Sequence, residues 1–156
     1  MAVKSLRDSD RLLHTFEARV KKYGIEASER MAKVFIDRLK TNIRKELLPV
    51  VPLSKKTLSA RRSRGNMSRR PLYDTKQYIN AITRKGNRVW VVNREHIHPN
   101  AKGGTINMIK LAMIHEYGLL DKGIPARPYW RLTRLQVERE FKQLLSAMTK
   151  EMRGKK

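Results

Sequence analysis

The sequence KLAMIHEYGLLDKGIPARPYWRL, residues 110–132, links two segments that have apolar residues at helical spacing. Upstream, residues 105–117 are apolar on nearly every side, which predicts a buried helix ending at Gly118, with a strand at the end of the segment as the alternative. Downstream, Pro125 and Pro128 stiffen the chain before the last helix begins. The stretch therefore predicts a structural joint between a buried element and the last helix.

Long helices are predicted on both sides of this joint. Residues 8–22 repeat apolar side chains every three or four positions, and Gly24 is predicted to end that helix. A second pattern over residues 28–48 predicts the longest early helix, which ends at the prolines that follow. The last pattern, Tyr129–Arg153, predicts a C-terminal helix with a short basic tail at residues 153–156.

The middle of the chain predicts a short helix and a small sheet. Asp74 or Thr75 can cap the helix, because a side-chain oxygen there satisfies an N-terminal amide. Val89–Val92 is β-branched and aromatic, which predicts a strand. Its partner lies either around residues 83–84 or within residues 96–106.

These elements together predict an α+β fold, a helix-rich single domain over residues 1–156 with a small antiparallel sheet. The length of 156 residues suits one domain with a real core. Hydrophobic residues make up 40% and charged residues 32%, so we expect a modest core under a heavily ionised surface.

The chain is strongly basic, with 36 Lys and Arg residues against 14 acidic residues and a formal charge of +22. We therefore expect an anionic partner. Residues 53–70 lack apolar periodicity and acidic side chains, which predicts a mobile basic loop, either a solvated arm or an arm that binds anions. Its candidate contact residues are Lys55, Lys56, Arg61, Arg62, Arg64, Arg69 and Arg70.

No set of catalytic residues is visible in the sequence. His115-Glu116 begins like the H-E-x-x-H helix of zinc proteases, but Leu119 stands where the second histidine belongs and Gly118 would interrupt the helix. No phosphate-binding loop, dinucleotide fingerprint or nucleophile elbow occurs, and there is no cysteine. We expect no enzyme activity, no metal and no cofactor, in a reducing cytoplasm.

A membrane partner is not expected either. The longest apolar run, Leu47–Leu53, is far shorter than the ~20 residues that span a bilayer.

Two sequence blocks resemble the signature of phage virion-morphogenesis proteins. Residues 112–121 are similar to that family's A-x-x-H-x-[YF]-G-L-x-D stretch, and residues 125–129 to its P-A-R-P-[FYL] block. Upstream, residues 71–75 resemble its P-L-x-D-T-G step, although Lys76 stands where the pattern has glycine. The matching residues are Asp74, Thr75, His115, Gly118, Asp121, Pro125, Arg127, Pro128 and Tyr129.

The resemblance implies a tail-completion or neck protein, which caps the phage tail and joins it to the head connector. It implies a ring of copies, usually six, in the virion, assembled in the host cytoplasm. The implied partners are other copies of the chain, the tail terminator or tail tube, and the head connector, with possible nonspecific contact to packaged DNA. A symmetric ring repeats one heterologous interface until it closes.

Two questions stay open at the level of sequence. The signature residues either fix the fold or contact a neighbouring subunit, for which Arg127, Tyr129 and Trp130 are the candidates. Arg127 offers a planar fork for a carboxylate or for backbone carbonyls. The alternative function is a cytoplasmic protein that binds nucleic acid without sequence preference, as the charge of +22 also allows.

Overall fold

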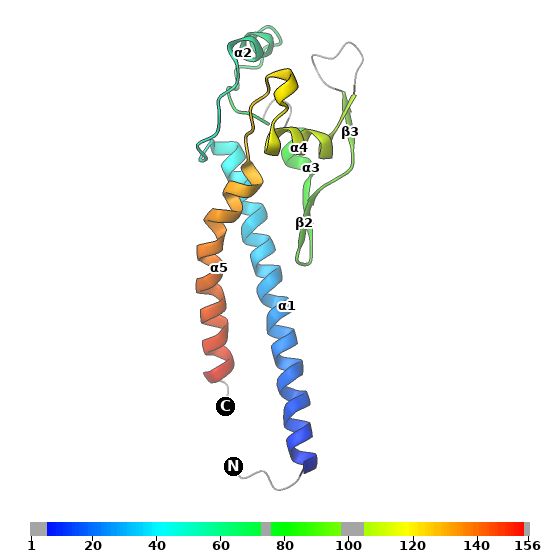
Figure 1. Cartoon of the computed structure of the whole chain (residues 1–156), viewed down its shortest axis with the longest axis vertical. Coiled ribbons are helices and arrows are strands. Elements are labelled where there is room, and N and C mark those ends of the chain that lie inside the picture. The colour runs from blue at the N-terminus through cyan, green and yellow to red at the C-terminus, as the bar shows by residue number, and fades with distance from the viewer. Residues whose placement is uncertain (1–5, 73–75, 98–104, 155–156) are drawn as a thin grey trace.

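The computed structural model describes residues 6–72, 76–97 and 105–154. It is a helix-rich α+β fold with antiparallel strands, which confirms the predicted class (Figure 1). The elements in chain order are α1 (Leu6–Lys45), α2 (Lys55–Arg62), α3 (Gln77–Ala81), β1 (Ile82–Lys85), β2 (Arg88–Val91), β3 (Glu95–Ile97), β4 (Thr105–Asn107), α4 (Met108–Tyr117), the 3₁₀ turn η1 (Leu120–Lys122) and α5 (Tyr129–Gly154).

Helix α1 is continuous over its 40 residues, so the predicted break at Gly24 is wrong. A glycine inside a helix costs only about 1 kcal/mol relative to alanine, and the hydrogen-bond ladder on both sides is uninterrupted. Helix α5 packs antiparallel against the C-terminal part of α1, while the first turns of α1 extend beyond the end of α5 (Figure 1). Because α5 continues to Gly154, the expected tail begins inside the helix, and residues 155–156 lie outside the described residues.

A buried polar contact sets the register between the two long helices. Asn42 of α1 donates hydrogen bonds from Nδ2 to Thr133 Oγ1 and to Gln136 Oε1 of α5, both at 2.9 Å. Asn42 and Thr133 are almost completely buried. A buried amide must find its partners, so sliding the helices by one turn would leave it unsatisfied.

The strands form two separate hairpins where one small sheet was expected. β1 pairs antiparallel with β2, with Ile82 opposite Val91, which settles the open choice in favour of the residues just before the turn. The other candidate region forms its own hairpin, in which β3 pairs with β4. Thr105–Asn107 is therefore strand, and the predicted helix at 105–117 begins only at Met108, capped by Asn107.

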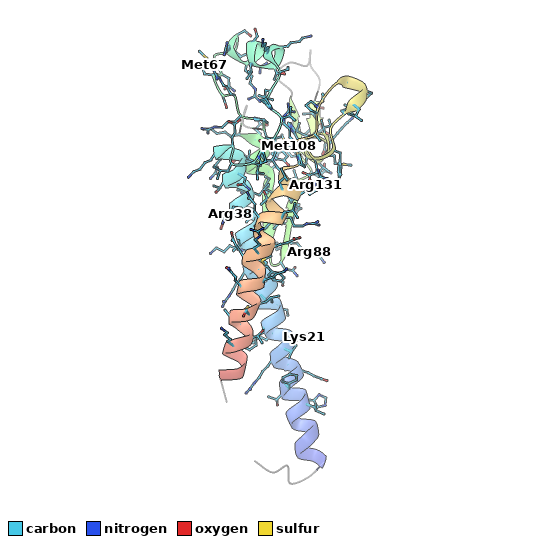
Figure 2. All side chains as sticks on the ribbon, turned by 60° about the vertical axis from the view of Figure 1, so that its left-hand side comes forward. Lys21, Arg38, Met67, Arg88, Met108 and Arg131 are labelled. Atoms are coloured by element: carbon cyan, nitrogen blue, oxygen red, sulfur yellow. The ribbon has the colours of Figure 1, made fainter. Side chains whose placement is uncertain are left out.

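The core lies where the C-terminal half of α1 meets α3, the first hairpin and the start of α5. Its buried side chains are Ile36, Leu39, Ile43, Leu48, Leu72, Tyr78, Ile79, Ala81, Ile82, Val91, Met108 and Tyr129. Figure 2 shows the length of the molecule, with Met67 at the end that carries α2, Met108 in the core region and Lys21 far along α1. The apolar burial is thus concentrated at one end of α1.

The predicted basic loop is wrong over its first half. Residues Lys55–Arg62 form α2, whose N-terminus is capped by Ser54 Oγ accepting from the Thr57 amide. Arg61 is buried, and its Nη1 donates to the carbonyls of Ser68 (3.2 Å) and Arg70 (2.8 Å). Sequence periodicity misses this segment because hydrogen bonds, those of Arg61 among them, and not an apolar stripe connect the following residues to the helix.

The short helix α3 follows a residue in an unusual conformation. Lys76 has φ 59° and ψ −3°, in the left-handed region that glycine adopts most readily. The predicted caps Asp74 and Thr75 lie outside the described residues. The P-L-x-D-T-G step that residues 71–75 resemble has glycine at this position. Lys76 therefore places a side chain where the backbone conformation favours a residue without one.

Replacing Lys76 with glycine is expected to raise the free energy of unfolding by about 1 kcal/mol, because the left-handed strain of a residue with a Cβ is removed. Thermal or urea unfolding measures the change. The matched control is Asn80→Gly on α3, which has ordinary helical geometry and should lower stability instead. Equal destabilisation by both variants would contradict the assignment.

Candidate functional site

The stretch between α4 and α5 folds back on itself as a hydrogen-bonded joint, defined as residues 115–129. Leu119 and Ile124 exchange backbone hydrogen bonds at 2.8 and 3.0 Å, with η1 between them. Closer to the helices, the Arg127 amide donates to the carbonyl of His115. Asp121 lies in η1 at the exposed tip. The joint fixes the angle at which the chain leaves α4 and enters α5.

Gly118 is required by this joint. Its φ of 81° and ψ of −178° fall in a region that only glycine adopts readily. A Cβ at this position would lie 2.9 Å from both the Ala126 amide nitrogen and the Ile124 carbonyl oxygen. The backbone of residues 124–126 therefore occupies the space that a side chain at position 118 would fill.

Arg127 ties the joint to the chain that leaves α1. Only 5% of the residue is exposed, and the guanidinium donates to two consecutive carbonyls, from Nε to Val51 (2.6 Å) and from Nη2 to Pro52 (2.9 Å). The flanking Pro125 and Pro128 are half-buried. The sequence left either a carboxylate or backbone carbonyls as the partner of Arg127, and the guanidinium contacts carbonyls. This geometry favours a role in fixing the fold over a subunit contact.

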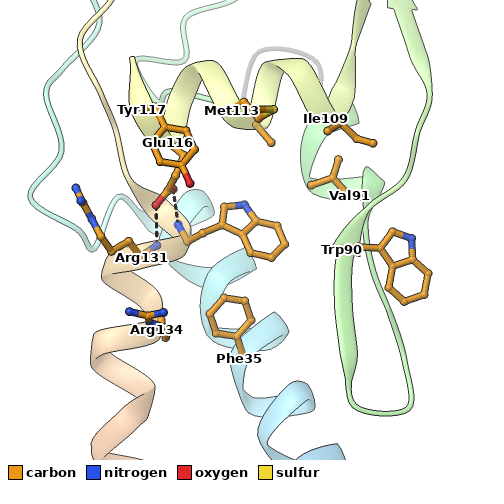
Figure 3. Close-up of a pocket in the computed structure, with 11 residues that line it drawn as sticks. Phe35, Trp90, Val91, Ile109, Met113, Glu116, Tyr117, Arg131 and Arg134 are labelled. Carbon is orange, nitrogen blue, oxygen red and sulfur yellow. Dashed lines mark hydrogen bonds between the residues drawn. The ribbon is translucent and has the colours of Figure 1, made fainter. Parts of the chain in front are cut away.

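Glu116 caps the last helix and is not placed as a catalytic base. Its carboxylate accepts hydrogen bonds from the amides of Trp130 (3.1 Å) and Arg131 (3.0 Å), two of the otherwise unsatisfied donors in the first turn of α5 (Figure 3). A negative charge at a helix N-terminus is also stabilised by the helix dipole. Sequence reasoning missed this role because the partners lie on a different helix.

His115 is half-buried, near Arg127 and Arg61. Its Nδ1 is buried without a hydrogen-bond partner. Burial, followed by the positive charges of Arg127 and Arg61, lowers the pKa of His115 to about 3. The imidazole is therefore neutral near pH 7, and no His, Asp or Glu groups in the described ranges lie close enough together to bind a metal.

This pKa predicts a pH dependence of stability. The unfolded chain binds a proton at His115 near pH 6.5 and the folded chain only near pH 3, so the free energy of unfolding should fall as the pH drops through this interval. The contribution is complete above about pH 6.5, and its slope is at most ~1.4 kcal/mol per pH unit. His115→Gln should flatten the slope between about pH 5 and 6.5 in urea unfolding.

The control for this measurement is His14→Gln, since His14 is exposed on α1. It should keep the wild-type slope. A slope unchanged by His115→Gln would show that the histidine is not held in its neutral form.

Beside the joint lies an apolar groove, called here the α4 groove, with a volume of about 560 Å³ (Figure 3). Its walls come from α4, β2, α1 and the first turns of α5. The lining residues are Phe35, Trp90, Val91, Ile109, Ala112, Met113, Glu116, Tyr117, Trp130, Arg131 and Arg134. The groove is apolar except for Glu116, which caps α5, and the two arginines on α5.

The composition of α4 predicted a helix that is buried on every side. This prediction is wrong. Met108 is fully buried, but Met113 is 56% exposed and Tyr117 75% exposed. The nearly continuous apolar sequence therefore supplies two surfaces, one to the core and one to the groove. An all-round apolar helix in a chain this short is itself a signal of an exposed apolar face, because a small core cannot enclose it.

Aromatic side chains support the floor of the groove. Trp130 packs against Phe35 with ring centroids 5.6 Å apart, and its Nε1 donates to the Tyr78 hydroxyl at 2.9 Å. Burial raises the pKa of Tyr78 to about 12, so this hydroxyl stays protonated. Tyr129, one residue earlier, is buried in the core, and burial likewise raises its pKa to about 12. Of the proposed subunit-contact residues, Trp130 is therefore the one that reaches the groove.

Among the predicted basic contact residues, Arg61 lies near His115 of the joint, and none of the seven lines the groove. Arg61 is buried and holds the residues after α2. The remaining six are exposed on or just after α2: Lys55, Lys56, Arg62, Arg64, Arg69 and Arg70. They lie at the end of the molecule that carries α2 (Figure 1).

Among the helices that the structure describes, none is long and apolar enough to cross a membrane. No protein-family model, curated protein or solved structure matches the chain. The resemblance to virion-morphogenesis proteins therefore stays a prediction from the residues.

Proposed function

We propose that this chain is a structural subunit of a tailed-phage virion, a tail-completion or neck protein that caps the tail and joins it to the head connector. The observation that carries the proposal is the backbone at Lys76. The family pattern has glycine there, and the backbone adopts the left-handed conformation that glycine favours. Position 76 is the last position of the P-L-x-D-T-G step, so the agreement extends that block of the resemblance by one residue.

The joint supports the same proposal. Gly118 and Arg127, two residues of the signature, have geometric roles that other residue types could not fill. Gly118 leaves room for the joint to close, and Arg127 ties the joint to the chain after α1, which is the role expected of a pattern kept for its fold. On this proposal the copies form a ring, usually of six, in the virion neck, with the tail terminator or tail tube and the head connector as neighbours.

Deleting the gene from the phage and examining the particles by electron microscopy tests the proposal. We expect full heads and complete tails that do not join, and a plasmid copy of the wild-type gene should restore joining. Labelled wild-type protein should appear in reconstructed particles at the neck. Normal joining without the protein, together with its absence from virions, would refute the proposal.

The charge distribution favours one second candidate, nonspecific nucleic-acid binding. Residues 53–70 carry seven Lys and Arg residues and no acidic residue. If these cations bind nucleic acid, replacing the exposed Lys55, Lys56, Arg62 and Arg69 with glutamine should weaken binding equally for unrelated DNA sequences. Fewer phosphate contacts should also reduce the dependence of log K on log salt, by about 0.9 for each lost contact to duplex DNA.

Arg61 is left out of this variant because it is buried and its loss would disturb α2. The matched control carries the same number of substitutions at exposed cations on the two long helices, Lys33, Arg139, Lys142 and Lys150. Equal weakening by both sets would indicate that only net charge matters. No measurable binding at low salt would eliminate the second candidate.

A further inference from the structure

The part of α1 that extends beyond α5 carries an exposed apolar ridge. Leu13, Phe16 and Val20 follow one another at steps of three and four residues, so they lie on the same side of the helix. They are 59%, 65% and 45% exposed. Single exposed apolar residues are ordinary, but three large ones aligned on a helix form a surface that favours a partner.

The ridge continues a face that is buried elsewhere on the same helix. Ala27, about two turns beyond Val20, is almost completely buried, and Met31 is half-buried. The sequence pattern is therefore that of a packed helix along its whole length. Only the first part has no covering element among the described residues.

The α4 groove is a concave apolar surface on the same molecule. Ile109 and Met113 project from α4 toward it, with Trp90 on β2 at its far side (Figure 3). Its polar groups are the exposed Arg131 and Arg134 on α5 and Glu116, whose carboxylate already accepts from the Trp130 and Arg131 amides. A convex apolar partner that carries a carboxylate would fit both the apolar lining and the cationic edge.

The ridge supplies such a carboxylate. Glu17 lies four residues after Leu13 and three before Val20, so it stands within the ridge. Its side chain is 73% exposed, with the exposed His14 at 3.9 Å. Arg134 meets Glu138 at 3.6 Å in an exposed pair one turn apart, which is worth only a few tenths of a kcal/mol and can readily be exchanged for a new partner.

The ridge and the groove of one molecule cannot meet. Phe16 is in the ridge and Phe35 lines the groove, and both are on the continuous helix α1. At 1.5 Å per residue, the helix holds them about 28 Å apart. Contact between the two surfaces therefore requires two copies of the chain.

We propose that the α1 ridge of one copy, formed by Leu13, Phe16, Glu17 and Val20, docks in the α4 groove of the next copy, with Glu17 facing Arg131 and Arg134. The contact is head-to-tail, the kind that builds a ring when its rotation closes. The proposal rests on the proposed ring-forming function and names the two surfaces that would build the ring.

Cysteine crosslinking tests the contact directly, because the chain has no cysteine of its own. Phe16→Cys and Met113→Cys are prepared as separate full-length proteins, mixed and oxidised. Head-to-tail docking predicts the crosslinked heterodimer as the main product. A protein with both substitutions should form a ladder of crosslinked oligomers. Arg139→Cys on exposed α5 replaces either partner as the matched control and should stay uncrosslinked.

Charge reversal gives a second test that does not depend on oxidation. Glu17→Arg should weaken self-association about tenfold, and combining it with Arg134→Glu should recover most of the loss. Analytical ultracentrifugation measures association, and circular dichroism verifies that each variant is folded. Absence of recovery in the double variant would count against the charge contact.

The outcomes separate this inference from the proposed function. Crosslinking of Phe16→Cys only to itself, in a protein that still forms rings, would overturn the docking and leave the neck function standing. A chain that stays monomeric at all concentrations, with no crosslink in the mixture, would also overturn it. Particle assembly without the protein would instead overturn the proposed function, whatever the crosslinking result.

Discussion

Replacing Gly118 with alanine is expected to lower the free energy of unfolding by about 3 kcal/mol or more. Two costs add at this position. The backbone conformation at φ 81° and ψ −178° is strained for any residue with a Cβ. The Cβ would also lie 2.9 Å from two backbone atoms of the joint, which can move only if the hydrogen bonds between Leu119 and Ile124 distort.

Urea unfolding followed by circular dichroism measures this effect, and Gly123→Ala is the control. Gly123 also has a positive φ, 62°, but a Cβ there would meet nothing within 4 Å. Its cost should be that of the backbone conformation alone, about 1 kcal/mol. The difference between the two variants is then the cost of the close approach in the joint. Equal losses of unfolding free energy in the two variants would mean that the joint accommodates a Cβ at position 118 at no extra cost.

Replacing Arg127 with methionine is expected to lower the free energy of unfolding by about 2–3 kcal/mol. Methionine keeps much of the apolar stem but removes both charge-assisted hydrogen bonds to the carbonyls of Val51 and Pro52. The loss detaches the chain after α1 from the joint. Since the positive charge of Arg127 also lowers the pKa of His115, that pKa should rise in the variant.

Two further variants locate the cause of this effect. Arg127→Lys keeps the charge but not the planar fork, so it should recover only a small part of the lost stability. Arg62→Met on the exposed side of α2 makes the same chemical change at the surface and should shift stability by no more than about 0.5 kcal/mol. If Arg127→Met and Arg62→Met were equally stable, the two carbonyl contacts would contribute nothing to the fold.

Arg61 of the basic segment and Arg127 of the joint show where sequence reasoning reaches its limit. Arg61 and Arg127 look alike in sequence, since each stands beside turn-forming or basic residues. The sequence predicts a structural role for Arg127 only. Both are buried, and both donate to backbone carbonyls. Such contacts leave no periodic signal, because the acceptor carbonyls are present at every residue.

The exposed surfaces show the same limit from the other side. Periodicity correctly predicted helices around Phe16 and Met113, since a repeat of three or four residues is a local property. Whether such a face is covered depends on another element, and the first turns of α1 extend beyond the end of α5 (Figure 1). Phe16, in this part of α1, is 65% exposed. The predicted burial of α4 on every side was wrong for this reason.

The sequence by itself determined the α+β class, the helical character of both halves of α1 and of α5, the strand at Val89, and the glycine and prolines of the joint. These features follow from local spacing, steric limits on φ and ψ, and charge, which act between near neighbours. The tertiary structure alone decided that Glu116 caps α5, that Arg127 binds the chain after α1, and that a ridge and a groove stay uncovered. Their partners come from residues far apart in the chain, which only the packing of the helices brings together.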